Sequence, residues 1–290
     1  MTVKTLSWGK HRLPLGERTL VMGILNVTPD SFSDGGKFER LDKAVSHARQ
    51  MVEEGADIID IGGESSRPFS DPVPVETELE RTIPVIERLS GKIDVPISID
   101  TTKHKVAKEA LAAGASMVND ISAMRQDPEM AALVADAGVP VILMHMLGTP
   151  KTMQEAPHYR NVTREIIGFL NDAANRAEAA GIPRAHIIVD PGIGFGKTVE
   201  HNLTLIKKVG ELQSLGLPIL IGPSRKAFIR KIMETHCGHE VSPDSPVAEA
   251  GTQAAVAAAV LGGANIVRAH DVKTTVTTVR IVDAIRNAPD

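Results

Sequence analysis

The chain has 290 residues, of which 42% are hydrophobic and 23% charged, and its formal net charge is −4. This composition predicts a soluble globular protein with a sizeable core, and the acidic balance argues against a nucleic-acid binder, which needs a basic face. No run approaches the roughly 18 apolar residues of a membrane span, and the first residues lack the apolar segment of an export signal. Cys237 is the only cysteine. No internal disulfide can therefore form, and a cytoplasmic location is expected.

An N-terminal β-hairpin is predicted within residues 1–18. Thr5–Trp8 and Arg12–Leu15 have the composition of two short strands, and Gly9 and Lys10 supply the turn between them. We expect this hairpin to cap the floor of the domain that the rest of the chain forms.

From residue 20 onward the chain repeats one pattern, an apolar strand with a polar end followed by an amphipathic helix. The predicted strands are Leu20–Asn26, Ile58–Gly62, Pro96–Asp100, Ser116–Ile121, Val141–Met146, Ile187–Asp190, Pro218–Gly222 and Asn265–Ala269. Between them, Leu41–Glu53 and Glu76–Leu89 carry apolar residues on one helical face. Pro84 is expected to kink the second helix or to mark its start.

Continuous Val, Ile and Leu strands that alternate with helices predict a parallel sheet covered on both faces. Eight such units, in a chain near the typical length of about 250 residues, predict a (β/α)8 TIM barrel. No linker divides the chain, so residues 1–290 are expected to form one α/β domain. An open, doubly wound sheet is the alternative.

Every predicted strand ends in hydrogen-bonding residues. In chain order they are Asn26; Glu64, Ser65 and Ser66; Asp100; Asn119 and Asp120; His145; Asp190; Ser224, Arg225 and Lys226; and Arg268 and His270. The carboxyl ends of barrel strands meet at one mouth, where such enzymes have their active sites. Helix capping explains some of these residues. Several acids and cations together predict a ligand pocket, because buried polar groups are costly unless they are paired.

The segment His186–Thr198, HIIVDPGIGFGKT, is the clearest case of a strand that ends in an acid and a glycine-rich turn. Two familiar nucleotide-binding motifs do not fit it. A P-loop needs a glycine where Pro191 stands, and the dinucleotide fingerprint needs one where Val199 stands. If Asp190 is considered alone, a polar turn with no functional role remains an alternative.

Long loops are predicted at the mouth. Thr28–Phe38 and Glu64–Val75 follow the first two barrel strands and are expected to act as active-site lids. Thr149–Arg160 is similarly long, and His236–Pro246 is expected to be a surface excursion with no catalytic task.

The polar strand ends favour two subsites. The carboxylates and one amide suit a flat heterocycle, because a carboxylate accepts two parallel N–H bonds; they are Asp100, Asn119 and Asp190. The cations and their neighbours suit an anion; they are Asn26, Arg67, Arg268 and His270. Mg²⁺ is a plausible cofactor beside such an anion, because hard oxygen ligands and phosphates recruit it.

Four residues need a separate interpretation. His145 is expected to be a hydrogen-bonded histidine of the pocket wall, and Arg225 is expected to form a structural ion pair. Phe195 lies between glycines that leave little to pack on, so a stacking role is favoured. Lys226 is expected to bind an anion or ligand at a helix N-terminus.

Motifs along nearly the whole chain resemble the dihydropteroate synthase family, in the family's order. They are Met22–Gly36, Gly62–Pro68, Ser98–Thr101, Val118–Asp120, Met144–Met146, Asp190–Lys197, Ser224–Lys226 and Arg268–Val272. The resemblance implies the condensation of a dihydropterin methyl pyrophosphate with para-aminobenzoate in folate synthesis. It also implies small-molecule substrates, bound Mg²⁺ and a homodimer.

The same resemblance implies a role for each matching residue. The pterin pyrophosphate would be bound by Ser66, Asp100, Asn119, Asp190, Lys226, Arg268 and His270. Para-aminobenzoate would contact Arg67, Phe195 and Ser224, and Mg²⁺ would meet Asn26. The implied catalytic residues are Asn26, Asp100, Asp190 and Lys226.

Two other functions stay open at this point. Methyltransferases that use methyltetrahydrofolate and a corrinoid protein bind a pterin at similar positions, but they hold no pyrophosphate. A catalytically silent pterin-binding paralogue would lack cations or lid residues, and the chain retains both.

Overall fold

The computed structural model describes residues 5–28 and 37–289. In this part, eight parallel strands lie in the order β8-β7-β6-β5-β4-β3-β10-β9. Their bounds are β3 Leu20–Asn26, β4 Ile58–Gly62, β5 Ile97–Asp100, β6 Met117–Asp120, β7 Val141–Met144, β8 Ile187–Asp190, β9 Leu220–Ile221 and β10 Ile266–Ala269. The Val189 N–H donates to the Pro218 carbonyl at 2.9 Å, and Val189 pairs with Ile219. These contacts close the sheet, so the predicted TIM barrel is confirmed and the open sheet is excluded.

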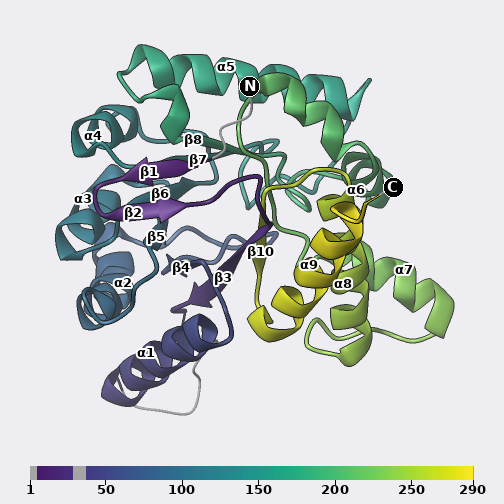
Figure 1. Cartoon of the computed structure of the whole chain (residues 1–290), viewed down its shortest axis with the longest axis horizontal. Coiled ribbons are helices and arrows are strands. Elements are labelled where there is room, and N and C mark those ends of the chain that lie inside the picture. Colours follow the sequence, from purple (N-terminus) through teal and green to yellow (C-terminus); the bar gives the residue numbers. More distant parts are fainter. Residues whose placement is uncertain (1–4, 29–36, 290) are drawn as a thin grey trace.

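Helices form a layer around the strands (Figure 1). They are α1 Lys37–Glu53, α2 Val75–Leu89, α3 His104–Ala113, α4 Met130–Ala137, α5 Val162–Ala179, α6 Val199–Lys207, α7 Ala227–Cys237, α8 Pro246–Leu261 and α9 Val272–Arg286, with 3₁₀ turns η2 Arg184–His186 and η3 Val209–Leu215. Pro84 lies well inside α2, so the prediction that it could mark the start of this helix was wrong. No helix in the described residues is long and apolar enough to cross a membrane.

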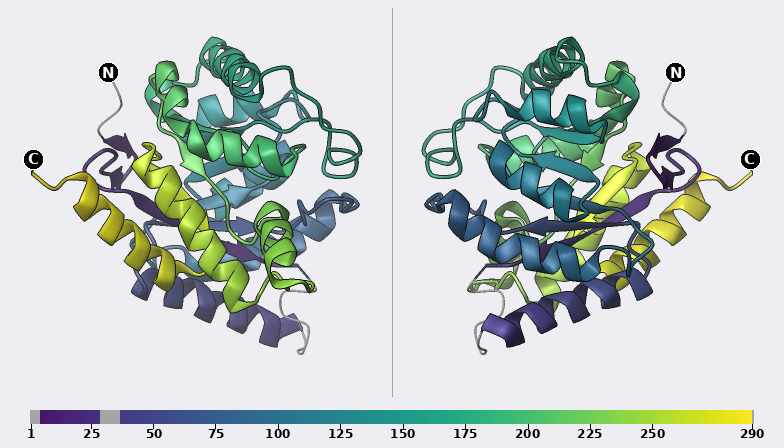
Figure 2. Two further views of the ribbon diagram at one scale, coloured as in Figure 1. Left: turned by 90° about the vertical axis from the view of Figure 1, so that its right-hand side faces the viewer. Right: turned by 90° about the vertical axis from the view of Figure 1, so that its left-hand side faces the viewer.

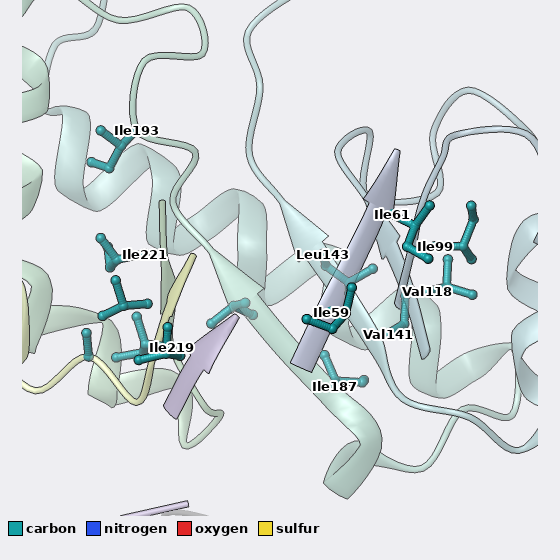
Figure 3. Close-up of a cluster of buried hydrophobic side chains, with 14 of the residues drawn as sticks. Ile59, Ile61, Ile99, Val118, Val141, Leu143, Ile187, Ile193, Ile219 and Ile221 are labelled. Atoms are coloured by element: carbon teal, nitrogen blue, oxygen red, sulfur yellow. The ribbon is translucent and has the colours of Figure 1, made fainter. Parts of the chain in front are cut away.

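Side chains alternate along each strand, because successive residues of a β-strand face opposite sides. Outward-facing residues pack against the helices, and Figure 3 shows Ile59, Leu143 and Ile187 among them. Inward-facing apolar residues fill the half of the barrel near the strands' amino ends; they are Leu20, Met22, Ile58, Met117, Ile142, Ile188, Leu220 and Ile266. We call this set the lower layer, and the inward-facing residues beyond it, at the mouth, the upper layer.

The predicted N-terminal hairpin is present and covers the lower layer. β1 (Leu6–Trp8) and β2 (His11–Leu13) pair antiparallel, with Leu6 opposite Leu13. Leu6, Trp8 and Leu13 are buried in the same apolar cluster as the lower layer. Figure 2 shows this hairpin at one end of the barrel and the long teal loop after β7 at the other. The prediction that the hairpin caps the barrel floor is therefore confirmed.

Candidate active site

The upper layer brings polar side chains from distant parts of the chain together at the mouth. Arg268 on β10 lies between two carboxylates: its Nε donates to Asp60 at 2.6 Å, and an Nη donates to Asp100 at 2.7 Å. Asp60 also accepts a bond of 3.0 Å from the Asn119 side chain. The strands β4, β5, β6 and β10 thus contribute to one hydrogen-bonded group. The prediction that these segments meet at a single rim is confirmed for this group.

Asp60 was missed by the sequence analysis. It is fully buried, and its second carboxylate oxygen, Oδ1, has no hydrogen-bond partner. Because a carboxylate only accepts, Asp60 requires the Asn119 amide to present its NH₂ inward. The carbonyl oxygen of Asn119 is then left to accept from a ligand. The two-residue period of β4, which places Ile58 inside the barrel, was the signal that also placed Asp60 inside.

Asp120 was predicted at the mouth beside Asn119, and this prediction was wrong. As the next residue on β6 it faces outward, where its carboxylate accepts the backbone N–H groups of Ser122 (2.7 Å) and Met124 (3.0 Å). Asp120 therefore shapes the loop after β6 and does not line the cavity.

Two of the predicted site carboxyls titrate abnormally. Burial raises the pKa of Asp100 to about 7, despite the opposing effect of Arg268, and the neighbouring charge of Asp60 adds to the rise. Burial likewise raises the pKa of Asp190 to about 6, opposed by the Gly192 N–H, which donates to it at 2.7 Å. Within the described residues Asp190 forms no salt bridge, so its remaining lone pairs are available to a ligand. Perturbed carboxyls in a cleft are typical of functional sites.

Asn26 and Ser66 lie close to the same carboxylates. A Cβ atom built on Gly62 would be 3.8 Å from the Asn26 Oδ1 and 3.5 Å from the Asp100 Cβ. These distances are ordinary van der Waals contacts, so both side chains lie next to Gly62. Ser66 and Asp100 line one small cavity next to them.

The glycine-rich turn after β8 contacts Lys226. The Lys226 ammonium lies 3.9 Å from the centre of the Phe195 ring, in cation–π geometry. A Cβ on Gly194 would be 2.9 Å from the Lys226 Cδ, so a side chain there would displace the lysine. Burial lowers the pKa of Lys226 to about 8, with Arg268 adding to the effect. Lys226 is thus held over Phe195 as a half-buried cation whose charge interacts with that of Asp190.

Phe195 is more buried than its sequence context suggested. It is 6% exposed and packs in a cluster with Met144, Met146 and Met153. The expectation that its flanking glycines leave it little to pack on was wrong, because the neighbouring loop after β7 supplies the methionines.

Ser224 and His270 form a second pair at the mouth. The Ser224 Oγ accepts the His270 backbone N–H at 3.2 Å and lies 2.9 Å from the His270 Nδ1. If the hydroxyl donates to Nδ1, the ring proton of the neutral imidazole is on Nε2. Burial, together with Arg225 and Arg268, lowers the pKa of His270 to about 3. His270 is therefore a neutral hydrogen-bond donor at physiological pH and not a cation.

His145 is a buried, hydrogen-bonded histidine, as predicted. Its Nδ1 accepts a bond of 3.1 Å from Lys197, a fully buried residue that the sequence analysis did not single out. Lys197 also donates to the Phe195 carbonyl at 2.9 Å. Burial lowers the pKa of Lys197 to about 7. The lysine joins the loop after β7 to the turn that carries Phe195.

Three of the four predicted loops lie wholly within the described residues. The loop after β4 is joined to the loop after β7 by the Phe69 N–H, which donates to the Pro150 carbonyl at 3.0 Å, and by a Lys151–Asp71 ion pair of 2.7 Å. Arg67, in the first of these loops, is exposed. In the segment His236–Pro246, Asp244 pairs with Arg225, which confirms the predicted ion pair of Arg225. Most of the predicted lid Thr28–Phe38 lies outside the described residues.

Comparisons with known proteins agree with this geometry. A family model described as pterin binding enzyme matches residues 22–270. The chain is 48% identical over 277 residues to the dihydropteroate synthase of Synechocystis, covering 96% of this chain and 93% of that protein. It is 44% identical over 270 residues to the dihydropteroate synthase of Escherichia coli, covering 93% of each.

Solved structures give the same result. The structure of Yersinia pestis dihydropteroate synthase with a sulfonamide drug complex has a TM-score of 0.90 and 43% identity, covering 98% of this chain and 100% of that one. The structure of Xanthomonas albilineans dihydropteroate synthase with 4-aminobenzoic acid has a TM-score of 0.89 and 45% identity, covering 99% of this chain and 100% of that one. The chain therefore belongs to the dihydropteroate synthase family of pterin-binding enzymes.

Proposed function

We propose that the chain condenses a dihydropterin methyl pyrophosphate with para-aminobenzoate, giving dihydropteroate and pyrophosphate. The observation that carries this proposal is the upper layer, where Asp100, Asn119 and Asp190 present acceptors beside Arg268. Acceptors of this kind fit the N–H edges of a pterin, and the guanidinium fits the pyrophosphate attached to it.

The pterin subsite follows from the hydrogen-bond directions. Asp190 has lone pairs left for the amide and amino N–H groups of the ring, and the Asn119 oxygen accepts a further N–H. Lys226 donates to an acceptor on the other edge of the ring, and Asp100 contributes a fourth contact. The buried setting strengthens each of these bonds, because little water competes there.

The pyrophosphate subsite combines Ser66, Arg268 and His270. The Nε and one Nη of Arg268 are committed to Asp60 and Asp100, which fixes the plane of the guanidinium and leaves its other N–H groups for phosphate oxygens. The His270 Nε2–H supplies a neutral donor. These groups stabilise the negative charge that grows on the leaving group as the bond between the pterin methylene and the pyrophosphate breaks.

Asn26 is the proposed protein ligand of Mg²⁺. Its side-chain oxygen is a hard donor at the mouth, next to the Asp100 side chain. A single protein oxygen suits Mg²⁺, because this ion keeps several waters and is usually completed by substrate phosphates. When bound, Mg²⁺ supplies charge neutralisation to the leaving pyrophosphate.

The para-aminobenzoate subsite is assigned to Arg67, Phe195 and Ser224. Lys226 already covers one side of the Phe195 ring, and Phe195 is only 6% exposed, so the aminobenzoate is expected against the small part of the ring that remains accessible. Ser224 is already hydrogen-bonded to His270, which leaves Arg67 as the main donor to the carboxylate. The amine attacks the pterin methylene without a dedicated strong base, and the barrel mainly orients the reactants and excludes water.

A homodimer and a cytoplasmic location complete the proposal. Exposed apolar residues on the later helices support self-association; they are Leu203, Ile232, Val247 and Leu261. Light scattering coupled to size exclusion tests the dimer, since a monomer at micromolar concentration would contradict it.

One assay tests the activity. Purified protein with Mg²⁺ and dihydropterin methyl pyrophosphate should release pyrophosphate only when para-aminobenzoate is added. Pterin binding without release would instead indicate a catalytically silent pterin-binding protein.

A further inference from the structure

The turn between β9 and α7 contains a strained residue. Arg225 has a φ of 58°. This left-handed region disfavours any residue with a Cβ, and glycine is the residue that adopts it without cost. Strain of this kind persists only where the surrounding structure holds it, and it gathers at functional sites. The contacts of Arg225 therefore need an explanation beyond a surface ion pair.

The backbone of Arg225 is held by α8. Its N–H donates to the Thr252 Oγ1 at 3.0 Å. Thr252 is fully buried, and its own hydroxyl proton is used by the Ala248 carbonyl at 2.9 Å. The Thr252 oxygen is consequently fixed as an acceptor for the turn.

The side chain of Arg225 is held at two further points. Its guanidinium pairs with Asp244 in the segment before α8, and its Nε lies 3.7 Å from the Glu249 carboxylate on α8. Glu249 is in turn held by the Gln253 amide at 2.6 Å. The helices α7 and α8 lie side by side at this flank of the barrel (Figure 1). Both the main chain and the side chain of Arg225 are thus attached to α8 and the loop that leads into it.

The residues on either side of Arg225 belong to the active site. Ser224 is hydrogen-bonded to His270, and Lys226 lies over Phe195. A left-handed residue bends the main chain sharply between its neighbours. The conformation of Arg225 therefore decides whether Ser224 and Lys226 can reach the cavity together.

We propose that Arg225 is a positioning residue for the substrate pyrophosphate and pterin. Its hydrogen bond to Thr252, its ion pair with Asp244 and its longer charge contact with Glu249 hold the left-handed turn that directs Lys226 and the Ser224–His270 pair into the cavity. This inference rests on the proposed function. It gives Asp244, in a segment outside the cavity, a part in substrate binding.

Three variants distinguish this positioning role from direct action of the side chain and from a purely structural role. Arg225→Ala keeps the strain and removes the ion pairs, Arg225→Gly removes both, and Asp244→Asn weakens one ion pair. Each is assayed for kcat and for the KM of dihydropterin methyl pyrophosphate, with thermal melting alongside. Glu211→Gln is the matched control, because it breaks an exposed ion pair with Lys208 away from the turn.

The expected order of kcat/KM is wild type, then Arg225→Gly, then Arg225→Ala. The alanine variant should be about five- to thirtyfold below the glycine variant, the size of the left-handed penalty of a residue with a Cβ. Asp244→Asn should raise the KM about threefold, as one charge-assisted bond is weakened, and the control should leave it unchanged.

Two outcomes would overturn the inference. Equal losses in Arg225→Ala and Arg225→Gly mean that the side chain acts directly and not through the turn. Lower melting temperatures with unchanged kinetics mean that it only stabilises the fold. If Arg225→Ala does not fold, Asp244→Asn decides, since kinetics equal to the control contradict the proposal. If the wild-type protein releases no pyrophosphate, the proposed function is wrong. Titration with inorganic pyrophosphate then still compares the affinity of the wild type and the variants for this anion.

Discussion

The lower and upper layers of the barrel are built from the same strands, yet they have opposite chemistry. Ile188 and Asp190 lie two residues apart on β8 and both face inward, as do Ile58 and Asp60 on β4. Below, aliphatic side chains and the hairpin bury apolar surface and stabilise the fold. Above, carboxylates and cations are buried at a cost that only mutual pairing and a ligand offset. Inward-facing residues only two positions apart on one strand thus serve different purposes, one stabilising the fold and the next forming the site.

The largest effect is expected for Asp190→Asn in the upper layer. The change replaces an acceptor of two N–H bonds with an amide whose NH₂ group would meet the donors of the pterin. Loss of such charge-assisted bonds should lower kcat/KM by about a thousandfold, measured as pyrophosphate release dependent on para-aminobenzoate. The Gly192 N–H can still bond to the amide oxygen, so the melting temperature should be kept. Undiminished pterin affinity in titration calorimetry would contradict the assigned role.

A second change in the upper layer, Arg268→Ala, should affect both stability and binding. It leaves Asp60 and Asp100 buried without their cation, which costs about 3 kcal/mol in unfolding free energy, at the lower end for a broken buried pair. Urea unfolding at pH 7 measures this loss. Arg280→Ala, at an exposed site on α9, is the control.

Binding by Arg268→Ala tests whether the site has two parts. The KM for the pterin pyrophosphate should rise, whereas a pterin without pyrophosphate should bind nearly as in the wild type. Equal losses of affinity for the two ligands would refute separate subsites.

A change in the lower layer should show the reverse pattern. Ile188→Ala removes a fully buried side chain from the barrel interior and should cost about 3 kcal/mol of stability, within the usual range for such truncations. The KM values of both substrates should stay at their wild-type levels, because Asp190 keeps its place on the strand. A changed KM in a folded protein would show that the two layers are coupled, contrary to the division drawn above.

The sequence predicted the lower layer more completely than the upper one. Continuous apolar runs and the polar residue at each strand end were sufficient to place the barrel strands and the residues Asp100, Asn119 and Asp190. Strand lengths were less certain: β9 is only Leu220–Ile221, shorter than the predicted Pro218–Gly222, because its pairing with β10 involves just these two residues.

The rest of the site depended on packing between segments far apart in the chain. Asp60 lies within an apolar run, so its role is apparent only once Arg268 and Asn119 are seen to meet it. Phe195 was misjudged because its packing partners come from another loop. The two-residue period of β4 predicts that Asp60 faces inward, but no local pattern identifies the partners of Asp60 or of Phe195.

The smallest expected effect is a pH dependence of pterin binding. It arises in the upper layer, because the lower layer has no titrating groups. Burial raises the pKa of Asp190 to about 6 and that of Asp100 to about 7. A pterin that donates N–H bonds prefers the ionised carboxylates, so its affinity should rise with pH between about 5 and 8. The gain should be about tenfold for each unit by which the bound pterin lowers the pKa of a carboxyl.

In the unliganded protein, the folding stability contributed by these two carboxyls changes with pH in the opposite direction: it falls as the pH rises. Both carboxyls have a higher pKa folded than unfolded, so their contribution to stability is present below about pH 4 and is lost as the pH rises through about 6 to 7. Titration calorimetry of the pterin across this range, in wild type and in Ile188→Ala, measures the binding slope. The two proteins should give the same slope, whereas Asp190→Asn should flatten it, because the removed carboxyl is one of the two groups that release a proton on binding. A slope that persists unchanged in Asp190→Asn would place the titrating group elsewhere.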